Sequence, residues 1–440
     1  MCFLSKRLCL ALFSFSFIIN SFAQDLVRAR KIMDTLASPA MFGRGYVNNG
    51  TGVAANFIAG EMKNTGLQPV KIPSSSGSGG LRDYQQEFTS AVKTYPSDVN
   101  LSINSKVLKA ATDFAIITGT PSVNGSFKIL EIDSTLFKKN NKINRLKKRN
   151  LDKTLLLYNP SEMKGENKRK ADSLIKYNYL KAGGFIQIID KPSISWSVYS
   201  PEEVLKFPVI TVLKSSLPEK PKHADVKIDL KVIEQFKLSN VIGYLPGTAI
   251  ADSFVIITAH YDHLGMLGKE AYFPGANDNA SGIAMMLDMA SYYSHPENRL
   301  PFCMIFIAFA GEELGLKGSK YCAEEPPFEL KKVKFLINLD MVGTGSEGIT
   351  VVNGDQFPAY FDRMVKINAD NEYLMKVVKR GESCNSDHCP FYRKGVPAVF
   401  IYSNGKEYTE YHNINDRAER VPLSEYEDIF RLGRDFINTL

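Results

Sequence analysis

Beyond its first residues, the sequence lacks any long hydrophobic run. No stretch after Ala23 in the 440-residue chain reaches the roughly 20 consecutive apolar residues that a membrane-spanning helix needs. We therefore expect no membrane insertion. Charge of one sign is also too unevenly spread to indicate nucleic-acid binding, although the net charge is +7. Much of that excess lies in one run from Lys138 to Arg149, which predicts a solvated helix face or loop.

The first residues have the pattern of a secretory signal peptide. The basic pair Lys6 and Arg7 precedes an apolar segment, Leu8–Ile19, which is too short to span a bilayer as a helix. The small-residue motif at 21–23 is typical of a cleavage site. We expect residues 1–23 to be removed, and the mature chain to be exported to the periplasm or the extracellular space.

Few cysteines remain after such cleavage. Cys303 and Cys322 frame a predicted strand and the helix after it, and Cys384 and Cys389 flank a short loop. An oxidising compartment permits disulfides within each of these local pairs. Four free buried thiols are the alternative, and the sequence leaves both open.

The chain is longer than a usual domain of roughly 100–200 residues, so two domains are expected. Residues 24–95 show helical periodicity at 26–36 and 52–64 and a Ser/Gly-rich loop at 74–80. Residues 96–235 change to short β-type runs, at 114–117, 154–158 and 185–189, around one helical stretch at 168–180. This block reads as an inserted domain.

Residues 236–440 alternate strands and helices. Near-continuous apolar strands of this kind predict an α/β sheet that is covered on both faces. The strands are expected at 255–259, 304–310, 335–339 and 397–402, and the helices at 280–293, 314–322 and 423–440.

Polar residues follow three of these strands directly. His260, Glu312 and Asp340 each come at a strand end. In open α/β sheets, ligands bind outside the carboxyl ends of the strands, so these side chains should converge there. Taken singly, each residue would more often be structural, as a cap or a surface group. Together with nearby segments they supply two histidines, two aspartates and two adjacent glutamates, namely His260, Asp278, Glu312, Glu313, Asp340 and His412.

This set suits two divalent ions. Zn²⁺ takes imidazole nitrogen and carboxylate oxygen, and a catalytic site keeps one position open for water. Asp278, on a short loop between Gly275 and Gly282, is placed to bridge two ions. One of the adjacent glutamates then remains free as a base. Asp262, two residues after His260, is expected to orient that histidine.

With these motifs, the chain resembles the M28 co-catalytic zinc metallopeptidases, loosely over residues 24–69 and closely over residues 239–440. The resemblance implies a three-layer α/β/α zinc-peptidase (phosphorylase/hydrolase-like) fold with a mixed central sheet, and two Zn²⁺ per chain, other divalent ions being possible. It assigns His223, His263 and His295 no ligand position, and gives the segment 386–391 a role in shaping the pocket. It implies the ligands His260, Asp278 and Asp340 for one zinc and Asp278, Glu313 and His412 for the other, with Glu312 as general base, Asp262 behind the ligands and Tyr411 at the scissile carbonyl.

The resemblance also implies that residues 96–235 are a smaller β-rich domain similar to a protease-associated (PA) domain, within a peptidase domain formed by 24–95 and 236–440. A purely structural insert is equally defensible. The expected activity is an aminopeptidase acting on peptides or proteins with a free N-terminus, with no nucleic-acid partner. A glutaminyl cyclase with one zinc and a non-catalytic binding protein are further alternatives. A carboxypeptidase or dipeptidase is another, and it would need a cation for the terminal carboxylate, for which Arg380, Arg393, Lys394 and Lys406 are candidates.

Overall fold

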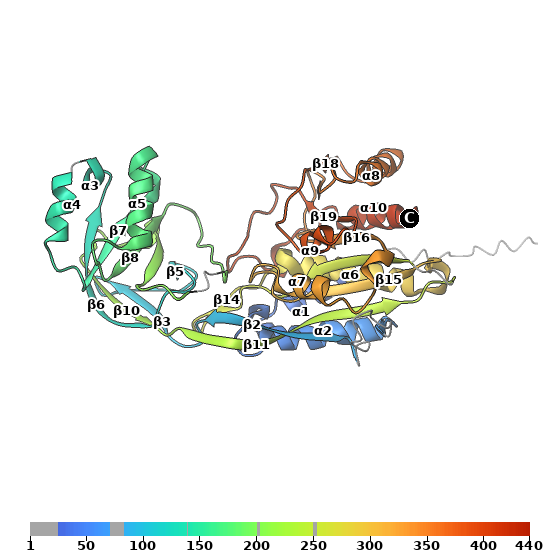
Figure 1. The fold of residues 1–440 in the computed structure, drawn as a ribbon, viewed down its shortest axis with the longest axis horizontal. Helices are drawn as coiled ribbons and strands as arrows, with labels where there is room; N and C mark the ends of the chain where they lie inside the picture. Colours follow the sequence, from blue (N-terminus) through green and yellow to red (C-terminus); the bar gives the residue numbers. More distant parts are fainter. Residues whose placement is uncertain (1–24, 71–82, 139, 200–202, 250–252) are drawn as a thin grey trace, which may run out of the picture.

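The computed structural model describes residues 25–70, 83–138, 140–199, 203–249 and 253–440. The predicted signal peptide lies outside these residues. Two β-sheets with their covering helices lie next to each other along the long axis of the molecule, and two long strands run between them (Figure 1). No helix in the described ranges is both long and apolar enough to cross a bilayer.

The larger sheet has nine strands among the described residues, in the order β1-β11-β15-β12-β16-β19-β17-β18, with β2 beside β11. Its centre is parallel, since β12 pairs with β15 and β16, and β16 with β19. The other pairings include antiparallel ones, so the sheet is mixed. Its strands are β1 (Gln68–Pro69), β2 (Gln85–Thr94), β11 (Lys231–Leu245), β12 (Phe254–His260), β15 (Cys303–Phe309), β16 (Val333–Leu339), β17 (Ile349–Val352), β18 (Val377–Lys379) and β19 (Ala398–Ser403).

Burial on both faces explains why these strands are apolar without alternation. In β12, Val255 and Ile257 belong to the hydrophobic cluster on one face, while Phe254 and Ile256 belong to the cluster on the other. The predicted α/β/α architecture is therefore confirmed. One face carries α1 (Leu26–Leu36), α2 (Gly50–Asn64), α6 (Ser281–Ser294), α8 (Pro358–Asn371) and α10 (Tyr426–Ile437), and the other carries α7 (Lys317–Glu324) and α9 (His388–Arg393).

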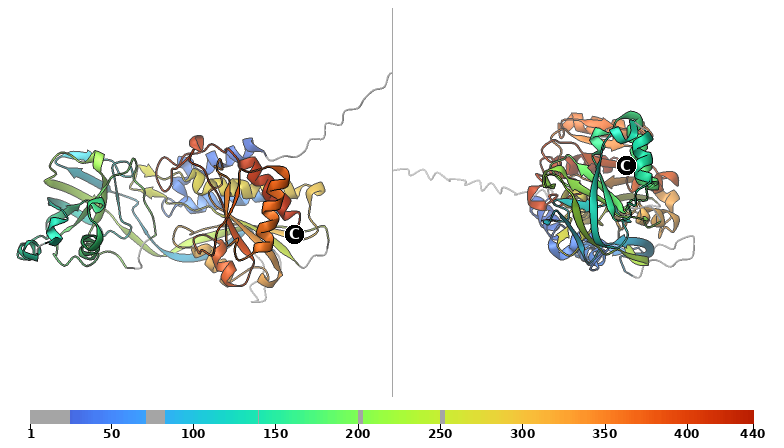
Figure 2. Two further views of the ribbon diagram at one scale, coloured as in Figure 1. Left: turned by 90° about the horizontal axis from the view of Figure 1, so that it is seen from above. Right: turned by 90° about the vertical axis from the view of Figure 1, so that its left-hand side faces the viewer.

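The second sheet lies wholly between β2 and β11 in the sequence. It has eight strands among the described residues, in the order β4-β3-β10-β6-β7-β8-β9-β5. Seen from above, it occupies one end of the molecule (Figure 2). Its strands are β3 (Val99–Ile103), β4 (Lys106–Leu108), β5 (Phe114–Ile116), β6 (Val123–Ile132), β7 (Thr154–Tyr158), β8 (Gly184–Ile189), β9 (Val209–Leu213) and β10 (His223–Ile228).

The helices of this insert are α3 (Thr135–Lys138), α4 (Asn140–Lys147) and α5 (Gly165–Tyr177). Leu136 of α3 and Leu174 of α5 pack with Leu156 and Phe185 of the sheet. The basic run falls largely on α4, where most of the side chains that the structure describes are exposed, as expected of a solvated helix.

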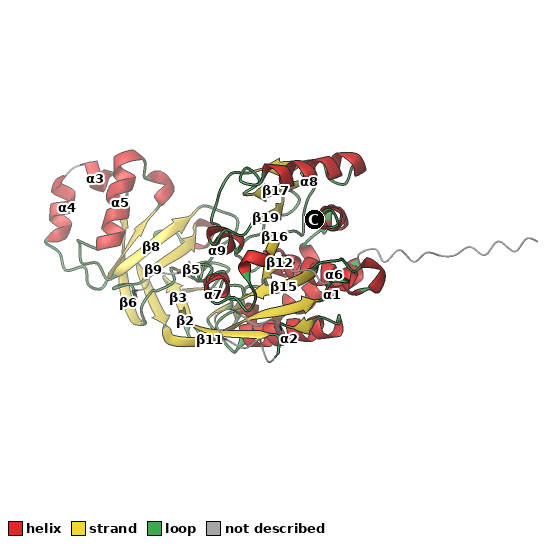
Figure 3. Ribbon diagram, turned by 45° about the vertical axis from the view of Figure 1, so that its right-hand side comes forward, coloured by secondary structure: helices red, strands yellow, loops and turns green. Residues whose placement is uncertain are grey.

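Two long strands connect the insert to the larger sheet. β2 leads out and β11 leads back, and they pair antiparallel from Thr94 and Lys231 to Gln85 and Val241 (Figure 3). The predicted boundary at 235/236 falls inside β11, at the register shift between Ile233 and Phe236. The connection is thus a paired ribbon rather than two separate linkers, and the sequence patterns gave no sign of this.

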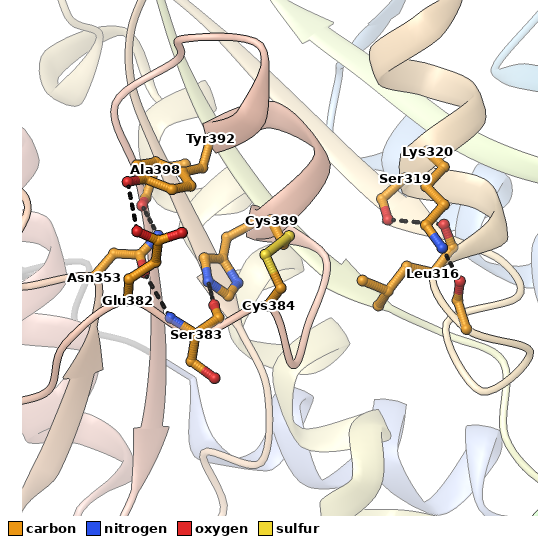
Figure 4. The surroundings of a disulfide bond; sticks show 12 residues. Leu316, Ser319, Lys320, Asn353, Glu382, Ser383, Cys384, Cys389, Tyr392 and Ala398 are labelled. Carbon is orange, nitrogen blue, oxygen red and sulfur yellow. Dashed lines mark hydrogen bonds between the residues drawn. A yellow bond between two sulfur atoms is a disulfide. The ribbon is translucent and has the colours of Figure 1, made fainter.

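The cysteines follow the local-pairing prediction only in part. Cys384 and Cys389 form a disulfide just before and within α9 (Figure 4), whereas Cys303 and Cys322 are free and buried, so their predicted pairing is wrong. The reason is that the helix is much shorter than the strand, because a helix rises less per residue. From Lys317 to Cys322 a helix climbs about 8 Å, while the strand from Cys303 to Phe309 spans about 20 Å. The helix ends before it returns to the start of its strand.

Candidate metal centre

The larger sheet delivers ligand-type side chains to one edge. His260 is the last residue of β12, Asp340 follows β16, and the turn bearing Glu312 and Glu313 follows β15. Because these three strands are parallel neighbours, their carboxyl ends lie together. Asp278 comes from the turn Ala276–Ala280 before α6, and His412 from the loop after β19.

The first group of ligand atoms surrounds His260. Its Nε2 lies 3.3 Å from Oδ1 of Asp278 and 3.4 Å from Oδ1 of Asp340. All three side chains are buried. Ligand atoms about 2.0–2.1 Å from one tetrahedral ion are roughly 3.3 Å apart, so these separations fit a shared Zn²⁺.

The second group uses the other oxygen of Asp278. Nε2 of His412 lies 3.1 Å from Oδ2 of Asp278 and 3.3 Å from Oε1 of Glu313. One carboxylate therefore faces two histidines, one with each oxygen, which is the arrangement of a bridging ligand. The structure thus brings together all five residues predicted as ligands.

His263 also lies in this second group, although the sequence reading gave it no ligand position. Its Nδ1 is 2.9 Å from Oε1 of Glu313 and 3.9 Å from Oδ2 of Asp278, and the residue is fully buried. Gly275 makes room for it, since a side chain there would meet the imidazole ring at 2.5 Å. His263 therefore lies among the predicted ligands, and its Nδ1 is closer to Glu313 than Nε2 of His412 is.

Unpaired atoms and charge both fit a cation at this place. Among the described residues, Nε2 of His263 is buried without a hydrogen-bond partner, and Nδ1 of His263 and Oε1 of Glu313 face each other at 2.9 Å without the geometry of a hydrogen bond. Burial alone would lower the pKa of His412, but the facing carboxylates of Glu313 and Asp278 raise it to about 11. A field that holds a proton so firmly also favours divalent cations. Buried carboxylates without such compensation would be costly.

Asp262 supports the site in a way the sequence did not indicate. Its carboxylate accepts the backbone N–H groups of Glu312 and Glu313, at 3.1 and 3.2 Å, and the hydroxyl of Tyr46 at 2.7 Å. Nδ1 of His260 instead lies 3.1 Å from the backbone carbonyl oxygen of Asp262. Asp262 therefore orients His260 through its main chain and fixes the two glutamates through its side chain.

A chain of buried hydrogen bonds holds Asp340. Ser386 donates to Oδ2 of Asp340 at 2.7 Å and accepts from Nδ2 of Asn338 at 2.8 Å, while Oδ1 of Asn338 accepts from Thr258 at 2.7 Å. The other oxygen of Asp340 is the one that faces His260. The segment around Ser386, expected to shape the pocket, thus supports a ligand as well.

The loop of Asp278 is fixed from behind. The Asp416 carboxylate accepts the backbone N–H groups of Asn277 and Asp278, at 2.9 and 3.1 Å. The guanidinium of Arg44, wholly buried, donates to backbone carbonyls on both sides of the site, including those of Tyr261 at 2.7 Å and Gly275 at 2.7 Å. Burial lowers the pKa of Arg44 to about 10. In the sequence it stood out only as an arginine between two glycines.

Comparison with known proteins agrees with this geometry. Residues 240–437 match the model of "Peptidase family M28". The chain carries an M28 peptidase domain. It is 31% identical over 229 residues to aminopeptidase YwaD of Bacillus subtilis, covering 49% of this chain and 47% of the relative. A probable zinc metalloprotease of Pyricularia oryzae is 36% identical over 116 residues, which are 26% of this chain and 23% of that protein.

Solved structures extend the likeness to most of the chain at the level of fold. The zinc aminopeptidase BSAP of Bacillus subtilis matches with a TM-score of 0.66 and 20% identity, covering 94% of each chain. The aminopeptidase of Aneurinibacillus sp. strain AM-1 matches with a TM-score of 0.61 and 18% identity, covering 94% of this chain and 93% of that one. The chain spans from about a quarter to about half of the length of the curated relatives it matches.

The two remaining predicted residues of the M28 site lie beside the ligands. Burial, together with the carboxylates of Glu313 and Asp387, raises the pKa of Glu312 well above its ordinary value. Tyr411 is 49% exposed, and its ring stacks on that of His412 with centroids 3.9 Å apart. Glu312 therefore holds a proton more readily than an exposed glutamate does, and Tyr411 is open to solvent at the rim.

The basic residues considered for a terminal carboxylate have other surroundings. Lys406 pairs with Glu347 at 2.8 Å, and Arg393 and Lys394 line a pocket next to the disulfide. Arg380 is exposed beyond β18. In the described ranges, no contact joins any of these four side chains to a predicted metal ligand.

Proposed function

We propose that this protein is an exported aminopeptidase that uses two zinc ions. The observation that carries the proposal is that the two carboxylate oxygens of Asp278 face different histidines. Its Oδ1 faces His260, and its Oδ2 faces His412. A carboxylate divided in this way fits two ions a few ångströms apart, as found in metal-dependent aminopeptidases.

The residues fit zinc by type and by spacing. His260, Asp278 and Asp340 would hold one ion, and Asp278, Glu313 and His412 the other, with His263 next to Glu313. When bound, zinc ions polarise the scissile carbonyl and make an attacking water more acidic. The His-and-carboxylate donor set favours zinc, although availability decides among divalent ions.

Glu312 would carry the proton. Its carboxylate takes a proton from the attacking water and later delivers it to the nitrogen of the leaving amine. Asp262 supports this role, since its bond to the backbone N–H of Glu312 fixes the turn from which the base projects. Tyr411, exposed beside His412, is available to donate a hydrogen bond to the carbonyl oxygen as negative charge develops there.

The charge of the site favours attack at the N-terminus. The described side chains around the ligands are mainly carboxylates, and Arg44 directs its guanidinium at backbone carbonyls. Two bound Zn²⁺ ions would offset the charges of the ligands, but the carboxylates that are not ligands, such as Glu312 and Asp387, still favour the ammonium group of a peptide, and in the described ranges none of the four basic residues considered above contacts a predicted ligand. This supports an aminopeptidase over a carboxypeptidase. Export by cleavage after Ala23, and a PA-like identity for residues 96–235, are further parts of the proposal.

The test uses purified protein beginning at Gln24. Release of the first amino acid would be followed on free and N-acetylated peptides, with and without a chelator. We expect release from the free peptide only, lost with the chelator and restored by zinc. Glu312→Gln should lower kcat by roughly 1,000-fold or more while the protein still binds zinc.

Three results would contradict the proposal. Hydrolysis that ignores acetylation would indicate a carboxypeptidase. One zinc per chain with cyclisation of N-terminal glutamine would indicate a glutaminyl cyclase. A zinc-loaded protein that turns over neither substrate would indicate a binding protein.

Lys406→Ala is a matched control, since its ammonium group is exposed and paired away from the ligands, and its activity should equal that of the parent.

A further inference from the structure

One segment of the insert, Ile194–Tyr199, touches two of the loops that form the metal site. We infer that this segment belongs to that site, with Trp196 positioning the loop of the ligand His412 and thereby coupling the insert to the second metal. The inference rests on the proposed two-zinc function, since it concerns how a ligand of one ion is held.

The contact with the ligand loop is made through the main chain. The backbone N–H of Trp196 donates to the carbonyl oxygen of His412 at 2.9 Å. Next to it, the hydroxyl of Ser195 donates to the carbonyl oxygen of Tyr411 at 3.3 Å. His412 itself has a left-handed backbone, with φ of 54°, which is unfavourable for a residue with a side chain. An external hydrogen bond at this position stabilises the conformation that aims the imidazole at Asp278.

The same segment lies over the turn that follows β15. Tyr199 is 66% exposed, yet its ring covers Gly315, where a side chain would meet Cε2 of the tyrosine at 3.0 Å. Gly315 comes two residues after Glu313. The segment therefore contacts the loops of two ligands of the same predicted ion.

The insert holds this segment firmly. The indole Nε1 of Trp196 donates to the carbonyl oxygen of Ile116, at the end of β5, at 2.9 Å. Thr118 donates to the carbonyl of Ser197. The indole ring also packs against Phe273 of the larger domain, with centroids 5.2 Å apart, and Trp196 is almost completely buried. A displacement of the insert would therefore move the backbone N–H of Trp196, and with it the carbonyl group of His412.

Residues that hold a ligand from outside typically change metal affinity by roughly 10- to 100-fold when they are removed. Trp196→Ala takes away the anchor on Ile116 and Phe273 but leaves every ligand in place. Two zinc dissociation constants would be measured for the full mature chain by competition with a chromophoric chelator. We expect one to weaken by roughly 10- to 100-fold and the other to stay unchanged, with lost activity restored by excess zinc.

Two further variants make the result specific. Trp196→Phe keeps the ring packing on Phe273 and the backbone N–H but loses the bond to Ile116, so its zinc affinity should fall between those of Trp196→Ala and the parent. Tyr177→Ala removes an exposed aromatic residue of α5 in the same insert, and both of its affinities should equal those of the parent. Parental affinities for both ions in Trp196→Ala would overturn the inference.

A second measurement needs no change at Trp196. It is the single tryptophan of a chain with 20 tyrosines, so emission excited on the red edge, where tyrosine does not absorb, reports on the surroundings of Trp196. Titration of the metal-free protein with zinc should change the emission as one of the two ions binds, and His412→Ala should abolish that change. Tryptophan emission that stays unchanged while both ions bind would overturn the inference, even if Trp196→Ala fails to fold. Zinc binding with coupled fluorescence but without hydrolysis would contradict only the proposed function.

Discussion

Both sheets of this protein have four neighbouring parallel strands at their centre, but only the larger sheet has the predicted metal site at the ends of these strands. In the larger sheet β12, β15, β16 and β19 include three parallel pairings, and in the insert β6, β7, β8 and β9 do as well. Both sheets also place polar residues directly after these strands. In the insert they are Asp133 after β6, Asn159 after β7, Asp190 after β8 and Lys214 after β9.

What differs is where these side chains find partners. In the insert each of these polar side chains has a hydrogen-bond or ion-pair partner within the insert. Asp133 accepts from Thr135 at 2.6 Å, Asn159 accepts from the N–H of Ser161 at 3.1 Å, and Asp190 pairs with Lys214 at 2.9 Å. In the M28 domain the carboxylates face histidines and one another, and they are buried. A polar residue at a strand end therefore indicates a site only when its neighbours leave it without a local partner.

The largest expected effect compares a carboxylate from each region. Asp278→Asn removes one charge from both predicted ions, whereas Asp190→Asn removes one half of an exposed pair. We expect Asp278→Asn to lose both metals and to lower kcat/KM by at least about 1,000-fold, or about 4 kcal/mol. Metal content by mass spectrometry and peptide turnover would measure this. Two retained zinc ions in Asp278→Asn, or a comparable loss in Asp190→Asn, would break the comparison.

The next prediction compares two histidines that the sequence could not tell apart. His263 is fully buried beside Glu313, and His223 is exposed at the start of β10. His263→Asn should weaken zinc binding by roughly 10-fold or more, measured by chelator competition, because a neighbour of the ligands is lost. His223→Asn should leave it unchanged. Equal affinities in the two variants would show that His263 plays no part at the metals.

Stability should distinguish two arginines. Arg44→Met would leave several backbone carbonyls beneath the site without a donor. We expect a loss of on the order of 4 kcal/mol in the free energy of unfolding, measured with urea in the presence of chelator. Arg145→Met, on the exposed face of α4, should change it by less than about 0.5 kcal/mol. A small loss for Arg44→Met would mean that water replaces the guanidinium.

The last prediction concerns acid. Burial lowers the pKa of His388 from 6.5 to about 4. Below pH 6.5 the unfolded chain therefore takes up a proton that the folded one does not, and the folded state loses stability as the pH falls towards 4. The parent should lose about 2 kcal/mol more than His388→Asn by about pH 5. Parallel pH profiles from urea unfolding of the two proteins would contradict this.

Sequence patterns were most informative where one physical constraint dominated. Runs such as Val255–Ala259 must be buried on both faces, so β12, β15 and β16 were predicted within a residue or two. Strand ends then placed His260, Glu312 and Asp340 together. β2 and β11 were missed, because β2 consists mainly of polar residues and the first half of β11 is mostly exposed, so neither forms an apolar run.

The missed site residues share a different property. His263, Tyr46, Arg44 and Asp416 act through partners distant in sequence, such as Tyr46 with Asp262 and Arg44 with Gly275. No short sequence pattern around either residue indicates such a pair. Arg44 between two glycines was the one available signal, since Gly43 and Gly45 let the chain approach Gly265 too closely for any side chain.

The ribbon of β2 and β11 has a consequence for chain connectivity. Thr94 and Lys231 are cross-strand partners, so the insert is topologically the loop of an ordinary antiparallel hairpin. A short turn between these two residues would close the hairpin and leave the order of the larger sheet intact. The shortened chain would keep every predicted ligand and lose Trp196. Hairpin tips tolerate long additions at little entropic cost, and here the added chain returns through Ser195, Trp196 and Tyr199 to the loops of two predicted ligands.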